Sequence, residues 1–214
     1  MLQARYQEPP GRSLRRPTTP NTMDSVGAGE RALTALFLSV SARTAGFNTV
    51  RMDEAALSSG GHFLLCVLMV VGGSPGGTAG GAKTVSVSVL LLTVLSTLRR
   101  REQVEAFYRA VHWPVIRMAS VLVTAYGCAL IVTTLLLCFT EAAGLRPVFF
   151  EACSALGTVG LSTGLTPHLT VPGRCVIILA MFAGRLGPLT LLVAMAGLVK
   201  AARYEYPSER LVLG

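Results

Sequence analysis

The sequence predicts an all-α membrane protein whose helices are interrupted by re-entrant loops. Charged residues make up only 14% of the chain, against roughly 25% in a typical soluble domain, and mean hydropathy is +0.57. Three apolar stretches are long enough to cross a bilayer, which takes roughly 20 helical residues. A glycine-centred sequence of six residues also occurs twice, each time after a short apolar stretch. Together these observations exclude an ordinary soluble domain.

The two short apolar stretches predict helices that do not cross the membrane. Residues 31–42 and 146–156 are each about half as long as a spanning helix, which fits a re-entrant or buried helix. Non-helical backbone at membrane depth is tolerated only where protein or a water-filled cavity surrounds it. A short helix followed by a glycine loop meets this condition if the loop lines a pore.

The three long apolar stretches cover residues 63–98, 115–140 and 175–199, and each holds at most one charged residue. The first has 36 residues and as one helix would be about 54 Å long at 1.5 Å per residue, nearly twice the hydrocarbon thickness. Its middle, residues 72–81, contains six glycines and one proline. This composition disfavours helix, so we expect an intramembrane loop that divides the first stretch.

Arginines beside the ends of these stretches indicate how the chain is oriented. Residues 99–117 hold five arginines against two glutamates, which places this segment in the cytoplasm under the positive-inside rule. Lys200 and Arg203 place the C-terminus there too, and both glycine sequences then lie on the outer side. The distribution of basic residues is thus explained by the orientation of the chain in the membrane. We expect no nucleic-acid partner despite the net charge of +8.

The chain divides into five predicted segments. Residues 1–29 are rich in proline and arginine and contain no apolar run, which predicts a disordered tail. Residues 30–98 form the first unit, 99–114 a cytoplasmic basic linker, 115–203 the second unit, and 204–214 a cytoplasmic tail. The topology leaves the arginines of the first tail outside the cell. A spanning segment upstream of this sequence would remove the conflict, and Met23 is an alternative start.

The repeated sequence indicates two equivalent units. Residues 44–49 read Thr-Ala-Gly-Phe-Asn-Thr and residues 158–163 read Thr-Val-Gly-Leu-Ser-Thr, an offset of 114 residues. Gly46 lies 27 residues before Gly73, and Gly160 lies 27 residues before Gly187 in a Gly-Pro pair. Both copies therefore break the following span at the same place. For either copy alone, the simpler alternative is a glycine that follows the C-cap of a helix.

Motifs of enzymes and cofactor sites are not supported. Residues 72–76 fit the G-x-S-x-G nucleophile elbow, which needs a preceding strand and a following helix, and all three histidines fall outside the predicted membrane core. Residues 76–84 have Ala82 where a phosphate-binding loop requires glycine. The five cysteines lack metal-ligand spacing and read as small buried hydrophobes. We expect neither an intramembrane serine hydrolase nor a nucleotide site, and no cofactor in this chain.

Four segments in order carry a resemblance to a known family: residues 41–49, 72–84, 157–164 and 181–190. Over residues 31–199 the sequence resembles the C-terminal half of Trk/Ktr/HKT-superfamily potassium transporters, closest to the Ktr type. Members of that family carry four helix–pore-helix–helix repeats around one pore. The resemblance implies that this chain holds the third repeat without its first helix and a complete fourth repeat.

The resemblance also implies which residues select the ion. K⁺ would lie at the backbone carbonyls of a filter to which each repeat contributes one segment, because carbonyl dipoles replace the hydration shell of the cation and glycine supplies backbone freedom. The implied filter residues are Thr44, Ala45, Gly46, Phe47, Thr158, Val159, Gly160 and Leu161.

A flexible gate beneath the filter is implied in the same way. Its residues are Gly72, Gly73, Ser74, Pro75, Gly76, Gly77, Thr78, Ala79, Gly80 and Gly81. Arg185 would contact this loop, since an arginine in an apolar span costs about 2.5–3.5 kcal/mol on insertion scales unless it finds partners. A helix–helix contact is the alternative for Arg185. Lys83 either tunes the permeation path electrostatically or lies in the cavity mouth.

The implied function is passive K⁺ uptake across the cell membrane, with no bond-making chemistry. The implied partners are membrane lipid, a second copy in a homodimer, a cytosolic nucleotide-binding regulatory ring, and the N-terminal half of the pore that this sequence lacks. Two filter segments are half of a four-sided filter. The alternative is therefore a non-conducting membrane scaffold that retains half of the fold.

Overall fold

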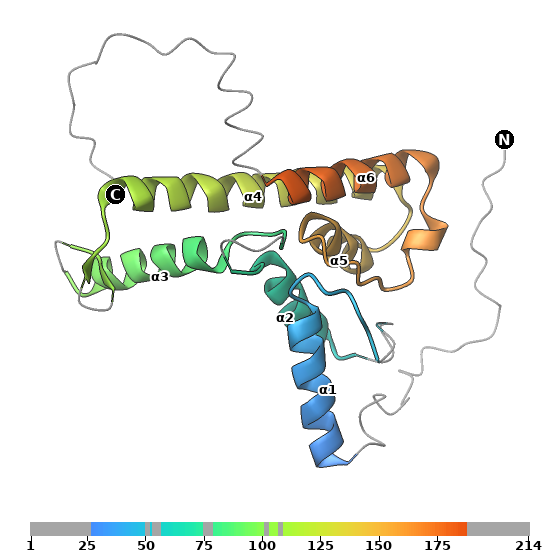
Figure 1. The fold of residues 1–214 in the computed structure, drawn as a ribbon. Helices are drawn as coiled ribbons and strands as arrows, with labels where there is room; N and C mark the ends of the chain where they lie inside the picture. Colours follow the sequence, from blue (N-terminus) through green and yellow to red (C-terminus); the bar gives the residue numbers. More distant parts are fainter. Residues whose placement is uncertain are drawn as a thin grey trace, which may run out of the picture.

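The computed structural model describes residues 27–49, 52, 57–74, 79–100, 103–106 and 109–187. Helices dominate this part of the chain, with one short hairpin between α3 and α4 (Figure 1). In order, the elements are α1 (Ala28–Ser41), α2 (Ser59–Val70), α3 (Thr84–Leu98), β1 (Glu105–Ala106), β2 (Arg109–Ala110), α4 (Trp113–Thr140), α5 (Leu145–Leu156), the 3-10 turn η1 (Thr166–His168) and α6 (Val171–Leu186).

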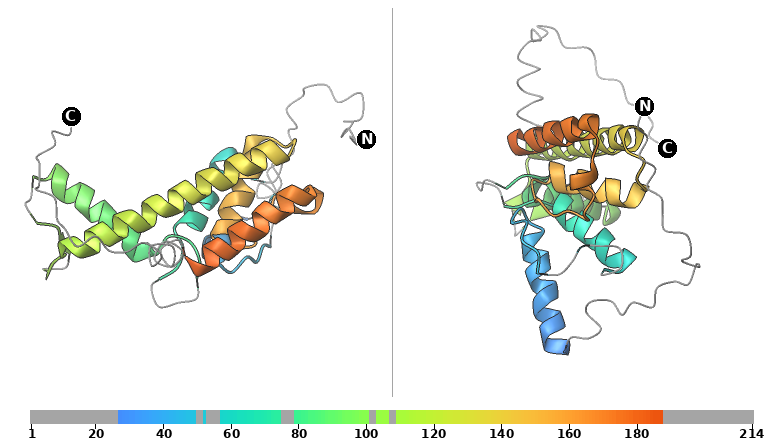
Figure 2. Two further views of the ribbon diagram at one scale, coloured as in Figure 1. Left: turned by 90° about the horizontal axis from the view of Figure 1, so that it is seen from above. Right: turned by 90° about the vertical axis from the view of Figure 1, so that its right-hand side faces the viewer.

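The longest helix, α4, organises the others. It packs against α3 near one end and against α5 and α6 near the other (Figures 1 and 2). The helix α5 is enclosed, since it contacts α2, α4 and α6. By contrast, α1 projects away from the other helices (Figure 1). Its contact with another helix is with α2.

The predicted spans correspond to helices of different lengths. Among the described residues, α4 alone is long and apolar enough to cross a membrane, with 28 residues. The first apolar stretch is divided: α2 ends at Val70 and α3 begins at Thr84, with the glycine-rich residues between them. The third predicted span began at residue 175, but α6 begins at Val171 and ends at Leu186, and residues 188–199 lie outside the described part.

Two predicted boundaries and the predicted linker differ from the structure. The first helix begins at Ala28, inside the predicted tail, and α4 begins at Trp113, before the predicted start at residue 115. Pro114 lies in the first turn of α4, where its missing N–H has no helical partner to lose. The predicted linker also contains the antiparallel pair β1–β2, in the register Glu105↔Ala110. Its strands have two residues each, too short for a periodic pattern to reveal.

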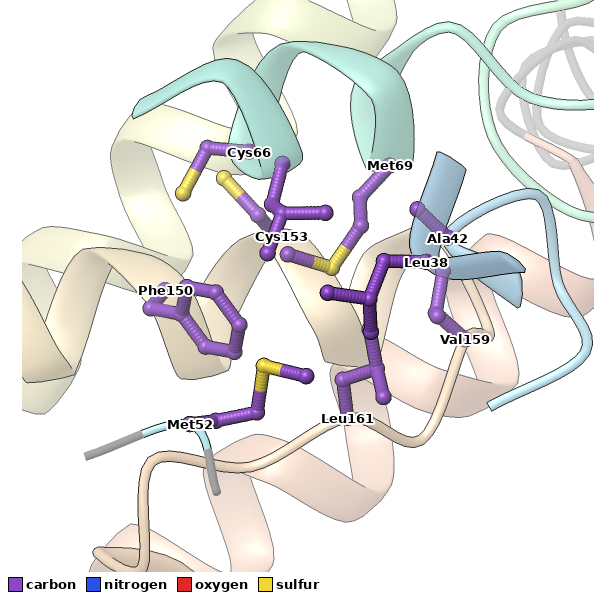
Figure 3. Packing of buried hydrophobic residues seen from close by; sticks show 10 residues of the cluster. Leu38, Ala42, Met52, Cys66, Met69, Phe150, Cys153, Val159 and Leu161 are labelled. Carbon is purple, nitrogen blue, oxygen red and sulfur yellow. The ribbon is translucent and has the colours of Figure 1, made fainter. Parts of the chain in front are cut away.

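The main hydrophobic core joins the two predicted units. Figure 3 shows side chains from α1, α2 and α5 converging on the chain that follows α5. Its buried members are Leu38, Ala42, Met52, Leu65, Cys66, Met69, Phe150, Cys153, Val159 and Leu161. Close packing of this kind is what holds helices together in lipid, where burial of apolar surface gives little driving force.

The order helix, loop, helix occurs twice with the spacing of the repeated sequence. Shifted by 114 residues, α1 (28–41) covers 142–155, against 145–156 for α5. The same shift moves α2 (59–70) to 173–184, inside α6 (171–186). Residues 43–49 and 157–163 therefore occupy equivalent places, and we call them the first and second Thr-Gly loops.

Candidate functional site

Both Thr-Gly loops have the same unusual backbone. Thr44 and Gly46 have φ of 68° and 74°, and Thr158 and Gly160 have φ of 52° and 92°. A β-branched residue at positive φ is an outlier, costs of order 1–3 kcal/mol, and persists only where the surrounding structure holds it. Its occurrence at both threonines marks these loops as the candidate site.

The two glycines do not simply end their helices. The helix α1 has its C-cap at Ala42, four residues before Gly46, and α5 has its C-cap at Gly157, three residues before Gly160. The alternative assignment of both glycines to the residue after a C-cap is therefore wrong. In the second loop Thr158 occupies that place.

The two loops contact each other. A β-carbon built on Gly46 would lie 2.1 Å from the carbonyl oxygen of Val159, so this approach requires glycine. Around Gly160 no described atom lies within 4 Å of such a β-carbon, and its positive φ is what favours glycine there. Val159 and Leu161 bury their side chains in the core beneath the contact (Figure 3), whereas Phe47 is 71% exposed.

Each loop is tied to the C-terminal end of the helix before it. In the first loop, the Gly46 amide donates to the Ser41 carbonyl at 3.1 Å, and Ser41 Oγ donates to the Phe47 carbonyl. In the second, the Val159 amide donates to the Ser154 carbonyl at 2.9 Å, and the Gly160 amide donates to Ser154 Oγ at 3.1 Å. Both loops thus lie at the partially negative end of a helix, which favours cations.

A buried carboxyl group holds the outer part of the second loop. Glu151, on α5, accepts hydrogen bonds from Ser162, Thr163 and Thr166 and is 5% exposed. Sequence reasoning missed this residue. The available signal was a single carboxylate within the short apolar stretch of residues 146–156, since such a group is seldom buried without partners.

The glycine-rich segment, residues 72–81, lies directly against the second loop. Its described parts are residues 72–74 and 79–81; the predicted gate residues 75–78 lie outside the described part. A β-carbon on Gly80 would lie 2.3 Å from Thr158 Oγ1 and 2.9 Å from the Gly157 carbonyl oxygen. Thr158 Oγ1 is buried and has no hydrogen-bond partner among the described residues.

Backbone bonds close the two ends of the glycine-rich segment. The Gly72 amide donates to the Ala82 carbonyl at 2.8 Å, and the Ala82 amide donates to the Val70 carbonyl at 3.0 Å. A β-carbon on Gly72 would lie 2.0 Å from the Gly80 carbonyl oxygen. The backbone at the two ends of the segment therefore passes too closely for a side chain at Gly72. A helix, α2, precedes the segment, which does not match the strand that a nucleophile elbow requires.

The two basic residues predicted near the gate have different surroundings. Lys83 Nζ donates to the carbonyl of Ala79, inside the glycine-rich segment, at 2.7 Å. Arg185 is exposed in the last turn of α6, two residues before Gly187, whose φ is 79°. The predicted contact of Arg185 with the gate stays a prediction.

Among the described residues no three His, Cys, Asp or Glu side chains form a metal-binding group.

A cavity of about 400 Å³ lies between α5, the second loop and α6. Its lining includes Glu151, Ser154, Thr158, Gly160, Ile177 and Met181. The site therefore consists of two adjoining glycine loops at helix C-termini, a cavity beside one of them that is lined by both polar and apolar residues, and a glycine-rich segment in contact with that loop. This arrangement suits the coordination of a cation by backbone and does not suit bond-making chemistry.

Comparison with known proteins gives consistent matches. Residues 16–205 match the model of the TrkH family, described as a cation transport protein. The chain is 37% identical over 195 residues to the Ktr system potassium uptake protein B of Vibrio alginolyticus, covering 91% of this chain and 42% of that protein. It is 39% identical over 181 residues to the Ktr system potassium uptake protein D of Bacillus subtilis, covering 84% and 40%.

A solved structure gives the same fold. The potassium transporter TrkH from Vibrio parahaemolyticus matches with a TM-score of 0.67 at 23% identity, over 81% of this chain and 39% of that one. The chain therefore spans about two fifths of the length of these relatives.

Proposed function

The chain belongs to the TrkH family of cation transport proteins, and we propose that it forms half of the wall of a potassium-conducting pore. The family is one of membrane transporters, so the chain is a membrane protein and not an enzyme. K⁺ is the proposed transported ion, moving passively down its electrochemical gradient.

The matched backbone of the two Thr-Gly loops carries this proposal. We assign the ion-selective filter to the carbonyls of Thr44, Ala45, Thr158 and Val159, with Gly46 and Gly160 beside them. Backbone carbonyls at such sites replace the hydration shell of K⁺. Two features support the assignment: the alternation of positive φ at Thr and Gly in both loops, and the approach of Gly46 to the Val159 carbonyl.

We propose that the glycine-rich segment is the gate. Its contact with Thr158 through Gly80 supports this, because a plug in contact with the filter must move before ions pass. Lys83 supports the closed arrangement through its bond to Ala79. Arg185 is the proposed second basic contact, from the end of α6.

The remaining half of the pore is proposed to come from elsewhere. Two loops provide two sides of a four-sided filter, and the chain spans about two fifths of its relatives. We therefore assign α1 to α3 to a third repeat without its first helix, and α4 to α6 to a fourth. The proposed partners are the missing half, a second copy, and a cytosolic nucleotide-binding ring facing the cytoplasmic linker and C-terminus.

Potassium uptake in a bacterial host that lacks its own K⁺ transport tests this function. The chain would be expressed alone, and together with the N-terminal portion of a full-length family member. We expect growth at low K⁺ and K⁺ uptake with both parts and not with either part alone. Correct membrane insertion of both parts with no uptake would instead favour a non-conducting scaffold.

A further inference from the structure

Glu151 is a buried carboxyl group that the ion pathway does not by itself require. It lies in the middle of α5 and is 5% exposed, and the helix around it is otherwise buried through small and apolar side chains. Burying a carboxylate is costly unless hydrogen bonds compensate. The bonds that it makes therefore indicate what it does.

Both carboxylate oxygens of Glu151 accept bonds from the chain that follows Gly160. Oε1 accepts from Ser162 Oγ at 2.5 Å and from the Thr163 amide at 3.1 Å, and Oε2 accepts from Thr166 Oγ1 at 2.8 Å. Thr163 Oγ1 lies 3.5 Å from Oε1. One side chain thus fastens residues 162–166 to α5.

These bonds complete the support of the strained part of the second loop. On its inner side, the loop is fixed by the bonds of Val159 and Gly160 to Ser154. On its outer side, Glu151 is the anchor. Gly160 is itself one of the inner attachments and Thr158 directly precedes them; both have positive φ, and unusual backbone of this kind persists only where the surrounding structure holds it.

Among the residues that the structure describes, the first loop has no equivalent carboxyl group. The position 114 residues before Glu151 is Phe37, which is 40% exposed. The chain after the first loop is held differently, by His62 Nε2 at 3.0 Å from the Met52 carbonyl oxygen. Support by a carboxylate is therefore a property of the second loop within the described chain.

We propose that Glu151 is a positioning residue for the second half of the filter, and that it sets K⁺ over Na⁺ selection by holding the loop. The proposal rests on the function proposed above. Both of its oxygens accept bonds from the protein, and Glu151 acts on the loop through these bonds. Its contribution therefore depends on hydrogen-bond acceptors at this place.

Ion fluxes through the complete pore in proteoliposomes test the role of Glu151. We expect Glu151→Ala to lower the K⁺/Na⁺ flux ratio about tenfold, equivalent to about 1.4 kcal/mol. Glu151→Gln keeps an acceptor for Ser162 and Thr163, so its ratio should stay within about threefold of wild type. Thr166→Val removes one donor and should lower the ratio about threefold, which keeps the test open if Glu151→Ala does not fold.

Glu141→Ala is the matched control. Glu141 is also buried, and its Oε1 accepts from the Thr170 amide at 2.9 Å and from Thr170 Oγ1 at 2.6 Å, but it supports the start of α6. We expect this variant to lose thermal stability while its flux ratio is unchanged. If both Ala variants changed the K⁺/Na⁺ flux ratio equally, Glu151 would contribute only to the general stability of the protein, and the proposal would be overturned.

Three further outcomes distinguish a failure of the role of Glu151 from a failure of the proposed function. A conducting wild-type pore with an unchanged ratio in Glu151→Ala would overturn the role of Glu151 alone. A loss in Glu151→Gln as large as in Glu151→Ala would mean that the charge acts, and would also overturn positioning. No K⁺ flux through the wild-type complete pore would overturn the proposed function, and this inference with it.

Discussion

Gly46 of the first Thr-Gly loop lies against the backbone carbonyl of Val159 in the second, so closely that a β-carbon would come within 2.1 Å of the oxygen. The two residues are 113 positions apart in the sequence. Their contact places the loops edge to edge, as adjoining sides of one filter would be. It also makes the two repeated glycines unequal, because Gly160 has no described atom within 4 Å of a β-carbon.

Alanine at Gly46 should therefore be more damaging than alanine at Gly160. Both substitutions place a side chain at positive φ, which costs roughly 1–2 kcal/mol, but only Gly46→Ala also collides with the other loop. In the complete pore we expect the K⁺/Na⁺ flux ratio to fall about tenfold or more for Gly46→Ala. For Gly160→Ala we expect a fall of roughly fivefold.

The order of the two effects is the decisive result. Gly127→Ala, in the interior of α4, is the control, because no described atom lies within 4 Å of its β-carbon and the helix favours alanine. If Gly46→Ala and Gly127→Ala gave equal K⁺/Na⁺ flux ratios, the contact between Gly46 and Val159 would no longer support the filter assignment.

Alanine at Gly80 should open the proposed gate. Its β-carbon would lie 2.3 Å from Thr158 Oγ1 and 2.9 Å from the Gly157 carbonyl oxygen, so the glycine-rich segment must move away from the second loop. We expect K⁺ efflux from loaded proteoliposomes to rise several-fold, on the order of 1 kcal/mol lost from the closed arrangement. Efflux equal to that of Gly127→Ala would instead identify the segment as a helix break without gating.

Lys83 provides a second, independent test of the gate. Its ammonium donates to the Ala79 carbonyl at 2.7 Å and so ties the glycine-rich segment to the start of α3. A charged hydrogen bond contributes roughly 1.5–3 kcal/mol, and Lys83→Met removes it. We expect resting K⁺ flux to rise several-fold, while Lys83→Arg keeps donors and charge and stays near wild type. A lower flux in Lys83→Met would contradict a tethering role.

Glycines with unusual backbone requirements were predictable from sequence, whereas contacts between distant segments were not. The repeated glycines, Gly46 and Gly160, marked both loops because glycine accepts positive φ readily, whereas the positive φ of Thr44 and Thr158 was not predictable, since a β-branched residue seldom adopts it. The glycines and the proline of residues 72–81 marked the interruption between α2 and α3 because these residue types disfavour helix. Glu151 was missed because hydropathy treats residues 146–156 as one apolar helix and says nothing about which side chains lie opposite.

Alanine at Gly184 tests the packing that supports the site. A β-carbon there would lie 2.1 Å from the carbonyl oxygen of Leu156, the last residue of α5, so α6 rests directly on the end of that helix. Moving α6 away loses many small packing contacts, and overpacking of this kind costs typically 1–3 kcal/mol. We expect Gly184→Ala to lower the thermal unfolding temperature in detergent by several degrees, while Gly127→Ala leaves it unchanged or raises it.

Because Leu156 directly precedes the second loop, the K⁺/Na⁺ flux ratio of Gly184→Ala should fall as well. An unchanged unfolding temperature for Gly184→Ala would show that α6 is not seated on α5 in the folded protein.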